Sequence, residues 1–168
     1  MSEQEKELKI VEEIKANLSG ELMENAIDFV THMNKTYGIT ENPDGTSGWY
    51  HLGERICFHI VVPNQFLVFF GHQSIVSTSD FDNFPLSDEL KEFAWSSVNV
   101  CRYCGKEMPI GMTIQSNPCR QGDNIIFGKK FDNLCNCPIG WINPDAKTFE
   151  KIKELAEAWK LCIAELKK

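Results

Sequence analysis

Five of the seven cysteines lie between residues 98 and 144, and their spacing is the strongest chemical signal in the sequence. A Cys-x-x-Cys pair is followed after fourteen residues by a single cysteine, and after fifteen more by a Cys-x-Cys pair: Cys101, Cys104, Cys119, Cys135 and Cys137. A Cys-x-x-Cys turn directs two thiolates toward one point, and structural zinc takes four such soft ligands. Because no histidine follows residue 72, we expect an all-cysteine structural zinc site formed by the first pair and two of the other three cysteines.

The second half of this cluster is less regular than a second Cys-x-x-Cys pair would be. We expect Cys135 and Cys137 both to bind metal only from an irregular turn; otherwise one of them is a buried bystander. Two other interpretations stay open. The cysteines can be small buried hydrophobic residues, or Cys101 and Cys104 can form a redox pair, although Gly105 leaves no strand–Cys-x-x-Cys–helix unit of the usual redox type.

The rest of the chain favours a reducing compartment. The first residues are polar, without the apolar core of a signal peptide, and the apolar stretch Phe66–Phe70 is far too short to span a bilayer. Seven cysteines cannot all pair within one chain. We therefore predict a cytoplasmic protein without a membrane partner, in which cysteines are metal ligands, reactive thiols or core residues before they are disulfides. Cys57 and Cys162 are expected in the core.

A second candidate site lies in the aromatic part of the chain. Ten of the eighteen aromatic residues fall between residues 49 and 95, and a few polar residues share the predicted strands. Apolar walls with a few convergent polar groups are typical of ligand pockets. The candidate ligand-binding residues are Trp49, His51, Arg55, His59 and Trp95. Strand alternation puts Arg55 and His59 on one face and Phe58 on the other, which conflicts with a single pocket unless a bulge intervenes.

Charge and motifs narrow the function classes. The chain carries 17 basic and 24 acidic residues, a net charge of −7, whereas nucleic-acid-binding surfaces are basic. We therefore expect a small molecule or a protein as partner, and no nucleic acid. The sequence has no nucleophile elbow, no His-Glu-x-x-His motif and no dinucleotide fingerprint, so nothing in it favours an enzyme.

Apolar periodicity predicts the elements that must position these residues. Helical spacing appears at residues 3–18, from Ser19 to Gly38, at 86–95 and from Asp145 to the end. Strands are predicted at 49–52, 55–62 and 65–71, with short connections typical of an antiparallel meander. Brief strands are predicted at 75–76, 112–115 and 124–127. We predict a single α+β domain over residues 1–168. Its β-meander packs against an N-terminal helix pair and a C-terminal helix, and a loop-rich cysteine lobe is inserted at 98–144.

The order of motifs resembles a group of proteins. Residues Cys101-x-x-Cys104, Gly128-Lys-Lys-Phe131, Asn133-Leu-Cys135 and Asn143-Pro-Asp145 precede a terminal helix. Together with Gly53-Glu-Arg-Ile-Cys57 in the meander, this order is similar to that of small bacterial cysteine-containing α+β proteins of unknown function. The resemblance implies a bacterial cytosolic protein and brings no activity with it.

Two functions follow from these patterns. The first is a non-enzymatic binding protein in which a structural zinc ion fixes the cysteine lobe. The alternative is a thiol-based redox or metal-responsive sensor that uses Cys101 and Cys104. Metal content separates the two, because only the first requires one zinc ion per chain with no accessible thiol in the lobe.

Overall fold

The computed structural model describes residues 8–43, 45–52, 55–62, 65–70, 86–100, 124–131 and 134–165. Its elements in chain order are α1 (Lys9–Asn17), α2 (Gly20–Tyr37), β1 (Ile39–Glu41), β2 (Ser47–Leu52), β3 (Arg55–Val61), β4 (Leu67–Phe70), α4 (Asp88–Ser96), β5 (Val98–Val100), β6 (Asn124–Ile126), β7 (Lys129–Phe131), β8 (Leu134–Ile142) and α5 (Ala146–Glu165). None of the helices within these ranges has the length and apolarity needed to cross a membrane.

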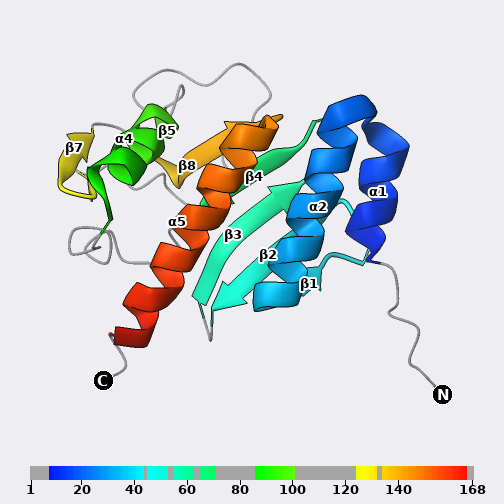
Figure 1. The fold of residues 1–168 in the computed structure, drawn as a ribbon, viewed down its shortest axis with the longest axis horizontal. Helices are drawn as coiled ribbons and strands as arrows, with labels where there is room; N and C mark the ends of the chain where they lie inside the picture. Colours follow the sequence, from blue (N-terminus) through cyan, green and yellow to red (C-terminus); the bar gives the residue numbers. More distant parts are fainter. Residues whose placement is uncertain are drawn as a thin grey trace, which may run out of the picture.

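The strands form a six-stranded antiparallel sheet in the order β1-β2-β3-β4-β8-β5, beside a separate β6–β7 hairpin. The first four strands follow one another as a meander. Figure 1 shows α2 and α5 lying across the same face of this sheet, with α1 beside α2. The predicted α+β fold, with its meander, N-terminal helix pair and C-terminal helix, is confirmed.

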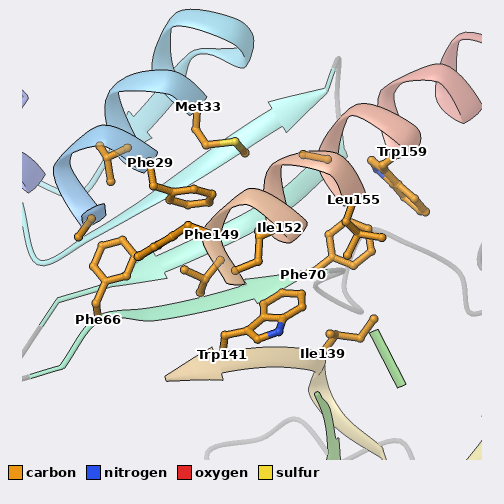
Figure 2. Close-up of a cluster of buried hydrophobic side chains, with 14 of the residues drawn as sticks. Phe29, Met33, Phe66, Phe70, Ile139, Trp141, Phe149, Ile152, Leu155 and Trp159 are labelled. Atoms are coloured by element: carbon orange, nitrogen blue, oxygen red, sulfur yellow. The ribbon is translucent and has the colours of Figure 1, made fainter. Parts of the chain in front are cut away.

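Aromatic rings fill the space between the sheet and the helices (Figure 2). The ring of Phe29 on α2 lies 5.0 Å from that of Phe149 on α5 and 6.4 Å from that of Phe66 before β4, measured between centroids. Farther along α5, Trp159 meets Phe70 edge-on at 5.3 Å. All five side chains are buried, and each buries enough apolar area to stabilise the layer by a few kcal/mol.

A turn with a left-handed residue joins the sheet to α5. Asn143 has a φ of 47°, a conformation that asparagine tolerates better than most residues. Its backbone N–H donates to the carbonyl of Phe66, and its side-chain Oδ1 accepts from the N–H of Phe66, both at 2.8 Å. Two residues later, Asp145 Oδ1 accepts from the N–H of Thr148 at 2.8 Å and caps α5.

Helix α1 contacts the sheet through residues that are distant in sequence. Its N-cap, Leu8, offers no side-chain hydrogen bond, and Glu41 of β1 accepts from the N–H of Ile10 at 2.7 Å instead. The following turn lies close to the helix, since a Cβ added at Gly45 would sit 2.9 Å from Lys9 Cβ. Gly45 also has a φ of 75°, so both space and conformation require glycine here.

The described part of the region from 98 to 144 contains more strand than the sequence predicted. Residues Leu134–Ile142 form a nine-residue strand that lies between β4 and β5 in the main sheet, where the sequence predicted only loops and brief strands. Strands β1, β5 and β7 were not predicted either, because three residues give no measurable period. The short strands predicted at 75–76 and 112–115 lie outside the described residues, as does most of the proposed lobe.

Candidate functional site

The pairing of β5 with β8 contains a bulge at the cysteine-containing edge of the sheet. Val98 pairs with Ile139, and Val100 pairs with Leu134. Two steps along β5 (98 to 100) thus correspond to five along β8 (134 to 139), where an unbroken ladder would give two. Bulges of this kind bend a strand and redirect its residues, and they are common at sheet edges and beside functional sites.

Two of the predicted zinc ligands belong to this bulged segment. Cys135 and Cys137 lie in β8 between the residues that pair with Val98 and Val100. Cys101, which follows Val100 in the chain, lies outside the described residues with Cys104 and Cys119. Within the described ranges, no three His, Cys, Asp or Glu side chains gather as a metal-binding group. The set of zinc ligands therefore stays a prediction.

The strand register aligns two of the predicted ligand-binding residues. Trp49 of β2 pairs with His59 of β3, and His59 pairs with Phe69 of β4. Paired residues of an antiparallel sheet belong to the same face, so these three positions form one cross-strand row. Phe58 belongs to the neighbouring row, opposite Tyr50 and Phe70.

A second bulge changes the relation of the other two polar candidates to this row. One step along β2, from Tyr50 to His51, corresponds to two along β3, from Phe58 to Ile56. After this bulge His51 pairs with Ile56, and Arg55 pairs with Leu52. The strict alternation that the sequence predicted for residues 55–60 is therefore interrupted at Cys57. Alternation along β3 thus no longer places Arg55 on the same face as His59.

The row of Trp49, His59 and Phe69 belongs to the face of the sheet that no described helix covers, because the adjacent Phe70 contacts α5. We call this face the open face. The described side chains on this face are more exposed than their neighbours in the same strands. Val68 and Phe70 are buried under the helices, whereas Leu67 and Phe69 are half-buried. Ile142, which pairs with Leu67, is 64% exposed. This face thus presents large apolar side chains beside the register positions of Trp49 and His59.

Trp95 lies elsewhere and has a local structural role. It belongs to α4, and its indole N–H donates to the carbonyl of Ile126 in the β6–β7 hairpin at 2.7 Å. The ammonium of Lys129 lies 4.9 Å from the Trp95 ring and 5.6 Å from that of Phe131, as expected for cation–π contacts. Phe93, on the same helix, stacks on Trp141 of β8. Trp95 therefore joins α4 to the hairpin and shares no cross-strand row with the other four candidates.

Ion pairs attach α5 to its neighbouring helices and raise the pKa of two of its lysines. Lys151 Nζ lies 2.8 Å from a carboxylate oxygen of Glu89 on α4, and this hydrogen bond raises the pKa of Lys151 and lowers that of Glu89. Lys153 Nζ lies 2.8 Å from Asp28 on α2. Burial alone would lower the pKa of Lys153, but its hydrogen bonds to Asp28 and Glu150 raise it. These groups hold helices together and carry no shift of the kind that acid–base catalysis needs.

No pattern in the sequence predicted one further feature, a hollow on the surface. An open hollow of about 210 Å³ lies between the first turn of α2 and the turn before α5, lined by Glu21, Leu22, Asn25, Asn143, Pro144 and Asp145. Its two walls are far apart in the chain, so no local pattern could have brought them together. Ile142 was missed for a related reason, because its strand was not predicted.

Neither a protein-family model, nor a curated protein, nor a solved structure matches this chain.

Proposed function

We propose that this chain is a non-enzymatic binding protein with a structural zinc ion at the β5–β8 edge and a ligand-binding surface on the open face of the sheet. The observation that carries the proposal is the register of β5 against β8. It pairs the last residue of β5, which directly precedes the Cys101–Cys104 pair, with the residue that directly precedes Cys135. The two halves of the cysteine pattern thus begin directly after two residues that pair with each other in the sheet.

The chemistry of the donors supports zinc over other metals. Thiolates are soft ligands, which suit zinc in a tetrahedral site and do not suit magnesium or calcium. The proposed ligands are Cys101 and Cys104 with two of Cys119, Cys135 and Cys137. When bound, the metal would supply folding free energy. A three-residue strand paired across a bulge makes few regular backbone pairs with its neighbour, so this edge is where such a crosslink would add most order.

The open face supports the binding role. Soluble proteins rarely leave large apolar side chains together on a surface unless something binds there. Leu67, Phe69 and Ile142 combine half-buried and exposed apolar area in one patch, and the register adds the positions of Trp49 and His59. A small molecule or a protein with an apolar surface fits these groups. The cytoplasm fits the zinc site, because a reducing compartment keeps cysteines available as ligands.

Native mass spectrometry of Cys101→Ser and Cys104→Ser tests the zinc proposal. We expect one zinc ion per wild-type chain and clearly less zinc in either variant, because loss of one of four thiolates weakens the binding of zinc. Hydrogen exchange should then quicken in β5 and in residues 134–137 of β8, while α2 and α5 keep their protection. Cys162→Ala is the matched control, since it removes a cysteine outside the cluster and should keep full zinc.

Two outcomes would overturn this assignment. Full zinc content in both serine variants would show that the ligands are other residues. Metal-free wild-type protein with one titratable thiol of low pKa would favour the alternative, a redox or metal-responsive sensor that uses Cys101 and Cys104.

A pair of matched lysine substitutions tests the open face. Ile142 and Leu161 are almost equally exposed, at 64% and 65%, but only Ile142 lies on the sheet, whereas Leu161 lies on α5. We expect Ile142→Lys to reduce the fluorescence of the apolar probe 1-anilinonaphthalene-8-sulfonate bound to the native protein by at least about half, and Leu161→Lys to leave it nearly unchanged. Equal effects of the two changes would refute a binding surface on the open face.

A further inference from the structure

We draw no further inference here: the strongest candidate, the open hollow between the first turn of α2 and the turn that precedes α5, is formed by two carboxylates and two amides beside helix N-termini, and nothing in the described part of the chain indicates what it would bind.

Discussion

In the middle of the sheet, β4 pairs with β3 and with β8 in unbroken register over all four of its residues, whereas at the edge β5 meets β8 across a bulge. Helices cover one face of this middle part, and buried phenylalanine and tryptophan rings fill the layer between the helices and the sheet. The edge strand is three residues long, and its first residue, Val98, is only partly buried. Regular pairing and deep burial thus occur together in the middle of the sheet, and the pairing becomes irregular where β5 meets the part of β8 that contains Cys135 and Cys137.

This difference indicates a division of roles within one sheet. Burial of large rings contributes most of the stability of the helix-covered middle. The edge pairs across a bulge over a strand of only three residues, and the proposed zinc crosslink would act there. Local opening at such an edge costs less free energy than global unfolding.

The largest expected effect comes from breaking the aromatic middle. Phe149→Ala removes a buried ring that contacts both Phe29 and Phe66, and we expect the free energy of unfolding to fall by about 3–5 kcal/mol. Leu161→Ala, at an exposed position on the same helix, should change it by less than about 0.5 kcal/mol. Urea denaturation followed by circular dichroism measures both. The folded variant should keep the proposed zinc ion at the level of wild type; loss of metal from folded Phe149→Ala would mean that the two regions are not separate.

A smaller effect is expected at Asn143, which follows the end of β8 that pairs with β4 in the middle of the sheet. Asn143→Ala removes the acceptor for the N–H of Phe66 and places alanine, which tolerates a positive φ less well than asparagine, at a φ of 47°. We expect this change to lower the free energy of unfolding by about 1–3 kcal/mol. Asn143→Gly keeps the conformation and loses only the hydrogen bond, while Asn143→Asp keeps an acceptor. Thermal unfolding should therefore rank the variants Asp, Gly, Ala in falling stability. If glycine proves no better than alanine, the left-handed conformation contributes little.

The smallest effect concerns the cap of α5 and its dependence on pH. Hydrogen bonds from Thr148 lower the pKa of Asp145 below its usual value of 3.8. A lowered pKa in the folded state adds stability above the unfolded value, and this stability is lost as the pH falls through the folded value. Asp145→Asn should lower Tm by about 2–4 °C at neutral pH, and its difference from wild type should shrink below a pH of about 3.8. A difference that stays constant down to a pH near 2 would exclude the ionised cap as its cause.

Comparing each variant with wild type at the same pH keeps this test independent of the metal. Acid protonates thiolates and releases zinc, but both proteins would lose it together. The difference in Tm then reports on Asp145 alone, because the hydrogen bond to Thr148 lies within α5 and its cap. The cysteine-containing edge contributes equally to the two curves.

The helices were predicted well because their signals are local. Ser19 and Gly38 flank α2 as its N-cap and C-cap, and the buried residues of α5 follow the predicted apolar stripe: Phe149, Ile152, Leu155 and Trp159. Helical contacts join residues three or four apart, so a short window of sequence contains them. The candidate sites were harder to predict, since Trp95 lies with the β6–β7 hairpin and away from the strands that carry Trp49 and His59.

The sequence by itself determined the helices, the meander and the cysteine pattern, because each depends on residues close together in the chain. Only the tertiary structure decided that residues 134–142 form an inner strand, that β5 pairs with it across a bulge, and that Trp49, His59 and Phe69 share one row. Sheet membership and register are set by partners that are distant in the chain, such as residue 98 opposite residue 139. A single bulge reverses which face the following residues occupy, so no count along one strand could have fixed these faces.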